Sequence, residues 1–162
     1  MHDIAQKRKI LGEMQGLIKL VRPKQWVKNS FVFAPLSFAG EFLHPDSVYS
    51  TLLAAFLFCI AASAVYIVND VDDVEKDRIH PEKCKKRPLA SGNVSPQSAI
   101  ILLILLYIVL ISFWTVVPNV IYVIFIYLAL NWAYTFKLKH EPVMDIFLVA
   151  FGFVLRVYAG AI

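Results

Sequence analysis

Charged residues are scarce in this sequence, at 17% of its 162 residues, whereas hydrophobic residues make up 59%. A soluble domain carries about 25% charged and about 45–50% apolar residues. Intrinsic disorder is excluded, because a chain with this much apolar surface does not stay open in water. A soluble fold around a single core is also disfavoured, because the apolar residues come in long uninterrupted blocks.

Cysteine is scarce as well, and the two cysteines do not form a disulfide or metal motif. Cys59 lies in an apolar block, and Cys84 lies in a polar loop that we expect to face a reducing compartment. The four histidines show no metal-ligand spacing. Residues 1–22 lack the continuous apolar segment and the cleavage site of a secretory signal.

Two blocks contain no charged residue, over 21 residues at 48–68 and over 20 residues at 98–117. A helix that rises 1.5 Å per residue crosses a bilayer core with about 20 such residues. No block shows sustained period-two alternation, and unpaired backbone groups cannot face lipid, so helices are favoured over strands. We therefore predict an all-α polytopic membrane helix bundle. Its five expected spans are 30–43, 48–68, 98–117, 119–136 and 143–162.

Lysine and arginine alternate between the connections of these spans. Seven precede the first span, six lie between the second and third, two lie between the fourth and fifth, and the other two connections contain none. The positive-inside rule then predicts a cytoplasmic N-terminus and cytoplasmic basic loops, in a multi-pass protein of the plasma (inner) membrane. We expect a cytoplasmic amphipathic segment at 1–29, a bundle at 30–162 and a cytoplasmic active-site loop at 69–97. The net charge of +4 then requires no nucleic-acid partner.

An acidic cluster follows the second block without an intervening turn residue, so we expect the same helix to continue through it. At 100° per residue, Asp70 and Asp77 lie within about 20° of one another, and Asp73 lies about 60° away. Three carboxylates on one face repel each other, and Mg²⁺ is the hard cation that such oxygen ligands suit. The alternative is a solvated helix end held by salt bridges.

A basic loop follows this cluster. His80 and Pro81 end the helix, because the residue before a proline avoids the helical region. The four cations of the loop are Lys83, Lys85, Lys86 and Arg87. Cations beside carboxylates that hold Mg²⁺ would form a diphosphate site. The positive-inside bias and attraction to anionic lipid also explain the charge, but not why opposite charges lie together.

Cations elsewhere have two interpretations. Lys24 and Lys28 would meet the phosphate of a lipid, or would anchor the chain at the membrane boundary together with Trp26. Tyr134 and Lys137 likewise would either bind substrate or anchor the chain at the membrane boundary.

Arg156 lies inside an expected span, so it needs a partner or a water-filled cavity, and we expect it to face the bundle interior. Asp145 lies about three turns away and is not expected to pair with it.

The pattern Asn69-Asp70-x-x-Asp73-x-x-x-Asp77, followed by Arg87-Pro88-Leu89 and Gly92, resembles the first aspartate-rich motif of the UbiA superfamily of intramembrane prenyltransferases. The runs at 77–83, 87–92, 22–29 and 134–140 are most similar to its decaprenyl-phosphate phosphoribosyltransferase branch. Members of the superfamily resemble one another in having about nine helices and a second aspartate-rich motif. This sequence contains no second motif, so it resembles the N-terminal half only. We expect the other half to be a missing C-terminal part or a second chain.

The resemblance implies transfer of a phosphoribosyl group from 5-phosphoribosyl diphosphate to a polyprenyl (decaprenyl) phosphate, for the synthesis of cell-envelope polysaccharide precursors. Asp70, Asp73 and Asp77 would be the catalytic residues and would hold Mg²⁺. The implied substrate-binding residues are Asn69, Lys24, Lys28, Asn29, Arg78, Lys83, Arg87, Tyr134, Lys137 and Arg156. Two alternatives stay open. One is an aromatic or quinone-precursor prenyltransferase of the same superfamily, and the other is a non-catalytic membrane fragment.

Overall fold

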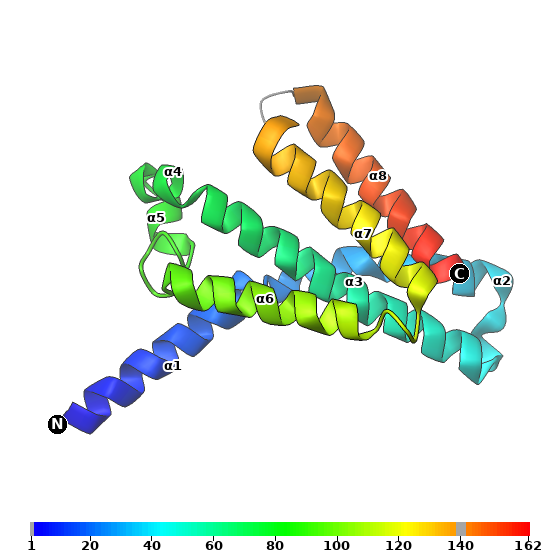
Figure 1. Cartoon of the computed structure of the whole chain (residues 1–162), viewed down its shortest axis with the longest axis horizontal. Coiled ribbons are helices and arrows are strands. Elements are labelled where there is room, and N and C mark those ends of the chain that lie inside the picture. The colour runs from blue at the N-terminus through cyan, green and yellow to red at the C-terminus, as the bar shows by residue number, and fades with distance from the viewer. Residues whose placement is uncertain (1, 139–141) are drawn as a thin grey trace.

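The computed structural model describes residues 2–138 and 142–162, and all the elements within them are helices (Figure 1). The prediction of an all-α fold is confirmed. In chain order the helices are α1 (His2–Leu20), η1 (Pro23–Phe33), α2 (Ala34–Ala39), η2 (Glu41–Leu43), α3 (Pro45–Asp72), α4 (Val74–Ile79), α5 (Lys83–Lys86), α6 (Pro96–Ser112), α7 (Pro118–Ala133), η3 (Tyr134–Leu138) and α8 (Pro142–Ala161).

Three helical stretches are long and apolar enough to cross a membrane, at Pro45–Asp72, Pro118–Lys137 and Val143–Ala161. A fourth apolar helix, α6, has 17 residues and is slightly shorter. Helices therefore occur where the second to fifth spans were predicted. The chain is a membrane protein.

The first span differs from its prediction as a helix over 30–43. A 3₁₀ helix of 11 residues, η1, begins earlier, and the six-residue α2 continues it to Gly40, where φ is 70° and the chain turns. A 3₁₀ helix rises about 2.0 Å per residue and an α-helix about 1.5 Å, so the two together extend about 31 Å. That length is close to the bilayer core of about 30 Å. Among the described residues, however, neither helix is one of the stretches long and apolar enough to cross a membrane, so the structure does not show the predicted first span.

Helix α3 is the centre of the bundle and packs against η1, α6, α7 and α8. Protein covers 67% of its most apolar stretch, against 22% in α8, so α8 leaves an apolar face uncovered. Helix α8 approaches η1 closely at Gly160, where an added Cβ atom would lie 1.8 Å from the carbonyl oxygen of Val32. A glycine is therefore required at this contact.

Helix α1 extends beyond the bundle (Figure 1). It is attached to the start of α6, where Ser98 donates a 2.6 Å hydrogen bond to Glu13. Further along α1, Gly16 packs against the Val94 side chain. The helix has an exposed apolar stripe, formed by Ile10, Leu11, Met14 and Ile18.

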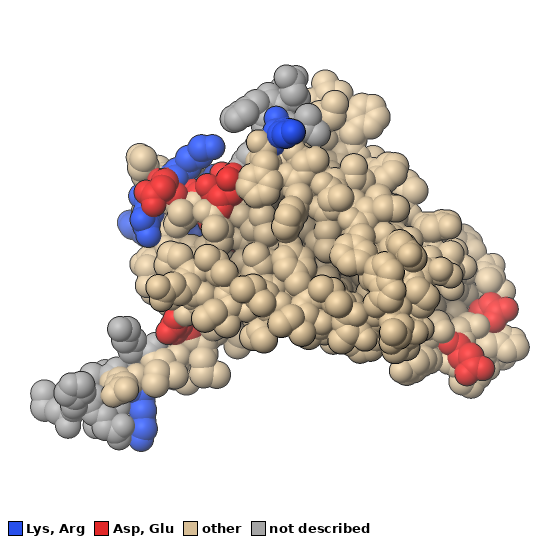
Figure 2. Space-filling model, viewed as in Figure 1, with Lys and Arg blue, Asp and Glu red and all other residues tan. Residues whose placement is uncertain are grey.

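Charged side chains gather at the ends of the molecule. On the face shown in Figure 2 most of them lie near α4 and α5, on α1 and near the start of α3, with an almost uncharged surface between these groups. This distribution is the one that a bundle crossing a bilayer requires.

Candidate functional site

The acidic cluster lies where α3 passes into α4. Asp73, with φ −88° and ψ 0°, is the single residue between the two helices. Its amide bonds to the carbonyl of Asn69 at 3.0 Å, and the amide of Asp77 bonds to the carbonyl of Asp73 at 2.8 Å. The expected single helix is thus interrupted at one residue, but the helical hydrogen-bond spacing continues through it. Asp70 and Asp77 consequently stay on one face.

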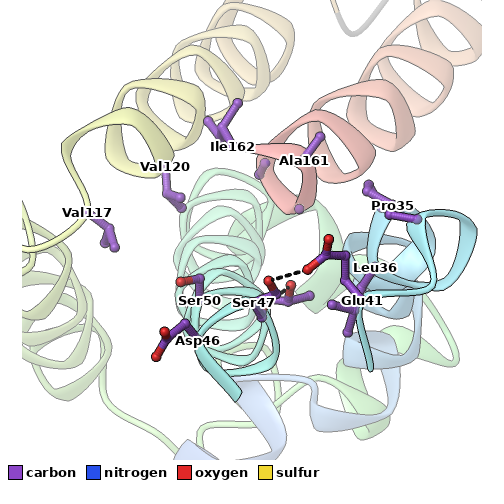
Figure 3. Close-up of a pocket in the computed structure, with 14 residues that line it drawn as sticks. Pro35, Leu36, Glu41, Asp46, Ser47, Ser50, Val117, Val120, Ala161 and Ile162 are labelled. Atoms are coloured by element: carbon purple, nitrogen blue, oxygen red, sulfur yellow. Dashed lines mark hydrogen bonds between the residues drawn. The ribbon is translucent and has the colours of Figure 1, made fainter. Parts of the chain in front are cut away.

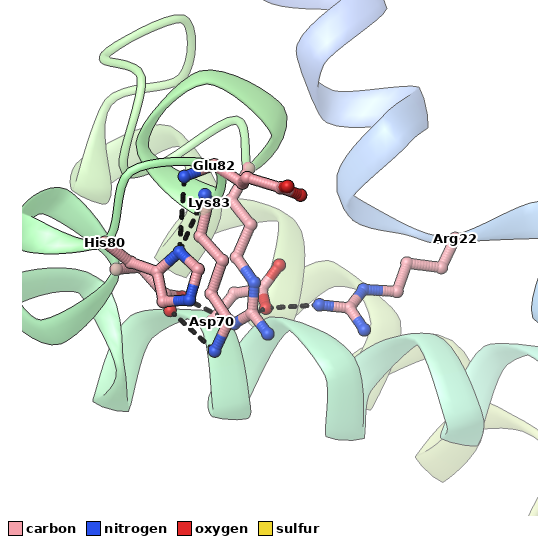
Figure 4. Close-up of polar contacts among 7 residues, drawn as sticks. Arg22, Asp70, His80, Glu82 and Lys83 are labelled. Atoms are coloured by element: carbon pink, nitrogen blue, oxygen red, sulfur yellow. Dashed lines mark hydrogen bonds and ion pairs between the residues drawn. The ribbon is translucent and has the colours of Figure 1, made fainter.

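The basic loop folds back onto these two carboxylates. Asp70 and Asp77 are each only 2% exposed. Arg87 Nη1 lies 2.9 Å from Asp70 Oδ1 and 2.6 Å from Asp77 Oδ2, so one guanidinium bridges both acids. Lys83 Nζ lies 3.5 Å from Asp77 Oδ1 (Figure 4). The predicted proximity of the acidic cluster and the basic loop is confirmed for these residues.

The loop is held in place by its own backbone and by an apolar anchor. His80 Nδ1 accepts hydrogen bonds from the amides of Glu82 and Lys83, at 3.2 and 3.4 Å (Figure 4). Beyond Arg87, the buried Leu89 and Val94 join a core cluster with residues of α1, α3 and α6. The cations therefore occupy fixed positions beside α3.

Arg22 is a site residue that sequence reasoning missed. Its Nη2 donates to Asp70 Oδ1 at 2.5 Å, and its guanidinium lies 4.8 Å from the centre of the Tyr66 ring. It adopts a left-handed conformation, with φ 53°, between α1 and η1. The available sequence signal was its place directly before Pro23, where a helix tends to end.

These residues border a cavity of about 680 Å³, which we call the polar pocket. It lies between the end of α1, the start of η1, the end of α3 and the basic loop. Its only carboxylate among the described residues is Asp70. Its cations are Lys19, Arg22, Lys24, Lys83, Lys86 and Arg87. Four of these cations form ion pairs with Asp70, Asp77 or Glu82, so six cations are offset by three carboxylates. The remaining positive charge favours an anionic ligand.

A second cavity, of about 120 Å³, lies between η1, α3, α7 and α8, and we call it the inner pocket. Its polar lining includes Lys28, Asn69 and Arg156. Arg156 is 7% exposed, which confirms that it faces the interior. Its Nε donates to Asn29 Oδ1 at 2.8 Å and its Nη2 donates to the Tyr127 hydroxyl at 3.3 Å.

Lys24 and Lys28 border different cavities, the polar pocket and the inner pocket respectively. On an α-helix residues four apart lie about 40° from one another. On the 3₁₀ helix that forms here, with three residues per turn, they lie about 120° apart. The structure does not support the hypothesis that both lysines meet one phosphate.

Four of the predicted substrate-binding residues, Asn29, Arg78, Tyr134 and Lys137, border neither pocket. Asn29 accepts the hydrogen bond from Arg156 described above. Arg78 forms an exposed ion pair with Glu75 at 2.8 Å. The Tyr134 hydroxyl donates a hydrogen bond to Asp145, and Lys137 is exposed. Asp145 and Arg156 have separate partners, as expected.

The two buried acids can be tested as Mg²⁺ ligands. Within residues 2–138 and 142–162, no three histidine, cysteine or acidic side chains converge as a metal site. Asp70 and Asp77 nevertheless converge on Arg87, and Mg²⁺ needs only one or two carboxylates with water and substrate phosphates. Asp77 Oδ2 is buried and, in the described structure, accepts no hydrogen bond despite its ion pair with Arg87. This pair of acids fits Mg²⁺ if Arg87 moves away.

A further cavity, of about 620 Å³, lies at the other end of α3 (Figure 3). Glu41 and Asp46 border it, and Ser47 donates a 2.9 Å hydrogen bond to Glu41. In the part of the chain that the structure describes, no lysine or arginine borders it. It therefore shares neither residues nor cations with the polar pocket.

Comparison with known proteins identifies the family. Residues 30–162 match the UbiA prenyltransferase family. The chain belongs to this family. It is 42% identical over 154 residues to the decaprenyl-phosphate phosphoribosyltransferase of Mycolicibacterium smegmatis. The aligned residues cover 92% of this chain and 48% of that relative. The protein of the same name from Corynebacterium glutamicum is 43% identical over 152 residues, covering 91% of this chain and 46% of the relative.

A more distant relative is the nodulation protein NoeC of Azorhizobium caulinodans, 32% identical over 142 residues, which cover 86% of this chain and 45% of that protein. The chain spans about half the length of the curated relatives it matches. The resemblance to the N-terminal half of UbiA proteins is thus confirmed. The family match includes Asn69, Asp70, Arg87 and Arg156, whereas the cations of α1 and the first half of η1 precede it.

Proposed function

We propose that the chain provides the donor site of a membrane transferase. The enzyme would move a phosphoribosyl group from 5-phosphoribosyl diphosphate to a polyprenyl phosphate, namely decaprenyl phosphate. The polar pocket carries this proposal, since six cations border it beside Asp70. The donor has two separate anionic groups, a diphosphate and a 5-phosphate, and a cavity of about 680 Å³ is within the about 300–1,000 Å³ of small-molecule sites. The names of the two decaprenyl-phosphate phosphoribosyltransferases described above support the same reaction.

The bond changes are those of a glycosyl transfer. The bond between ribose C1 and the diphosphate oxygen breaks, and diphosphate leaves with the electron pair. A new bond forms between C1 and an oxygen of the lipid phosphate. Because that phosphate is already an anion near neutral pH, the step requires no general base.

The residues of the polar pocket would compensate the charge of the donor. Lys83 and Arg87 would bind phosphate oxygens, with Arg22 close to Asp70. Asp70 and Asp77, with Asp73 between them, would hold Mg²⁺. When bound, the ion would neutralise charge that develops on the leaving diphosphate.

The orientation and the partners belong to the same proposal. The distribution of lysine and arginine favours an N-terminus and a basic loop on the cytoplasmic side of the plasma membrane. A water-soluble donor in the cytoplasm would then reach the polar pocket. The remaining half of the family fold, in the same chain or a second one, would complete the enzyme. Its products would serve cell-envelope polysaccharide synthesis.

Donor binding tests the proposal. The chain in lipid nanodiscs with Mg²⁺ should bind 5-phosphoribosyl diphosphate in isothermal titration calorimetry. Arg87→Ala should weaken binding by about tenfold or more, because a charge-assisted contact is lost. Lys85→Ala is the matched control, since Lys85 lies exposed in the same loop but does not border the polar pocket.

The comparison ligand is a prenyl diphosphate. Binding of this ligand without binding of 5-phosphoribosyl diphosphate would favour the aromatic prenyltransferase instead. In membranes with the complete enzyme, diphosphate release should require both 5-phosphoribosyl diphosphate and polyprenyl phosphate. Diphosphate release that requires an aromatic acceptor would contradict the proposed reaction.

A further inference from the structure

The inner pocket contains two cations and no carboxylate among the described residues that border it. Lys28 is exposed and makes no ion pair within the described chain. Arg156 is buried, and its hydrogen-bond partners, Asn29 and Tyr127, are neutral. A buried charge without a counter-charge is costly, so this pocket gains stability from an anion.

The guanidinium of Arg156 is fixed with one side facing the pocket. Its Nε and Nη2 hold Asn29 and Tyr127, and the rings of Phe153 and Tyr127 lie 5.6 and 5.2 Å from its central carbon. One turn earlier, a Cβ atom at Gly152 would come within 3.0 Å of Nη1. The glycine therefore leaves room beside Nη1, on the wall of the inner pocket.

The two pockets are neighbours on α3. Asn69 borders the inner pocket and the next residue, Asp70, borders the polar pocket. The Thr135 hydroxyl donates a hydrogen bond to Asn69. Because the amide of Asn69 is uncharged, this wall of the inner pocket is neutral. Consecutive residues of α3 therefore separate the two pockets.

The size and lining of the inner pocket limit its occupant. At about 120 Å³ it is smaller than the about 300 Å³ of typical small-molecule sites, but large compared with the about 15 Å³ that one water molecule needs. Apolar side chains border the cations, among them Val65, Leu148 and Val149. One phosphate group on an apolar chain matches this combination.

We infer that the chain has two separate anion sites, and that Lys28 and Arg156 bind the phosphate of a polyprenyl phosphate in the inner pocket. The identity of the lipid as the acceptor rests on the proposed function. The phosphate would be held by cations without a metal ion, next to the turn of α3 that faces the donor. Lys24 belongs to the other site, although only one turn of η1 separates it from Lys28.

A reciprocal pair of variants tests this division. The chain in nanodiscs is titrated with farnesyl phosphate and, separately, with 5-phosphoribosyl diphosphate. Lys28→Gln should weaken farnesyl phosphate binding by about tenfold and change donor binding by less than about twofold. Lys24→Gln, at an exposed position of the same 3₁₀ helix, should show the opposite preference. Lys85→Gln is the control for a general loss of positive charge.

Arg156 is tested by two substitutions, because removing a buried cation can prevent folding. Arg156→Lys keeps the charge but cannot maintain both hydrogen bonds, and should weaken farnesyl phosphate binding while the circular dichroism spectrum stays helical. Arg156→Met should abolish that binding if it folds. Farnesyl phosphate binding that is unchanged in both Lys28→Gln and Arg156→Lys would overturn the inference, as would an equal loss of both ligands in Lys28→Gln.

The source of the phosphate needs its own comparison. Farnesol should not compete with farnesyl phosphate, and inorganic phosphate should bind more weakly. Equal, Lys28-dependent binding of inorganic phosphate would show that free phosphate is the occupant and would overturn the lipid assignment. If farnesyl phosphate binds through Lys28 but 5-phosphoribosyl diphosphate does not bind at all, the proposed function fails while the inner phosphate site stands.

Discussion

Replacing Arg87 with glutamine should change metal affinity and stability in opposite directions. The guanidinium lies between Asp70 and Asp77, at 2.9 and 2.6 Å from their oxygens. In this position it stabilises the two buried acids when no metal ion is bound. If the two acids hold a divalent cation, as proposed, the guanidinium would compete with it for the same oxygens. Glutamine keeps much of the side-chain length and removes the charge.

The size of both effects follows from the geometry of the ion pairs. Two unit charges 4 Å apart interact by about 4 kcal/mol at an effective dielectric constant of 20. The Arg87 side chain is 24% exposed, and Arg22 and Lys83 remain as neighbouring cations, so screening reduces the change. We expect Mn²⁺, used as a probe for Mg²⁺, to bind about tenfold more tightly to Arg87→Gln, a difference of about 1.4 kcal/mol. Without metal, the free energy of unfolding should fall by about 2 kcal/mol, below the 3–5 kcal/mol of a fully buried pair.

The assay measures free Mn²⁺ by electron paramagnetic resonance during titration of the chain in nanodiscs, without diphosphate. Unfolding is followed by circular dichroism in the same membranes. Lys85→Gln, in the same loop but outside the cluster, controls for the loss of one positive charge. Adding Asp77→Asn to Arg87→Gln should restore part of the stability and remove the gain in Mn²⁺ affinity. Unchanged or weaker Mn²⁺ binding in Arg87→Gln would refute the competition between the guanidinium and the metal.

Three further predictions follow from other contacts. Gly160→Ala should lower the free energy of unfolding by about 2 kcal/mol or more, because its Cβ atom would collide with the Val32 carbonyl, whereas Gly12→Ala, with no atom within 4 Å of the added carbon, should not destabilise. Trp26→Phe should cost about 1 kcal/mol in the same unfolding assay, because it removes the 3.0 Å hydrogen bond to Ser63; equal stability would contradict this. Donor affinity should fall as NaCl rises from 0.05 to about 0.5 M, since six cations border the polar pocket; calorimetry at several salt concentrations checks this.

Much of the acidic and basic cluster could be predicted from sequence because its parts are close in the chain. Asp70 and Asp77 are seven residues apart, which is close to two helical turns, and the loop that carries Arg87 follows directly. The interior position of Arg156 was predictable too, since a charge in an apolar helix avoids lipid. Its partner Asn29, however, lies 127 residues away, and no local pattern indicates such a contact.

The geometry of η1 could not be predicted from the sequence. The angular separation of Lys24 and Lys28 depends on whether three or 3.6 residues complete a turn, and packing against α3 and α8 competes with local preference there. Arg22 was missed for a related reason. A left-handed backbone is unusual for a residue other than glycine, so its side chain points where helical extrapolation does not place it.

The length of α3 makes the depth of the acidic cluster depend on the host membrane. Its 28 residues extend about 42 Å, about 12 Å more than the hydrocarbon core of a typical bilayer. Asp70 lies two residues before the last residue of α3, so it can sit among lipid headgroups. The proposed water-soluble donor would reach it there. A membrane with longer or more ordered acyl chains would cover part of this excess length or force the helix to change its tilt. We therefore expect the acyl-chain length of the host membrane to change how easily a soluble ligand reaches the polar pocket, with the protein unchanged.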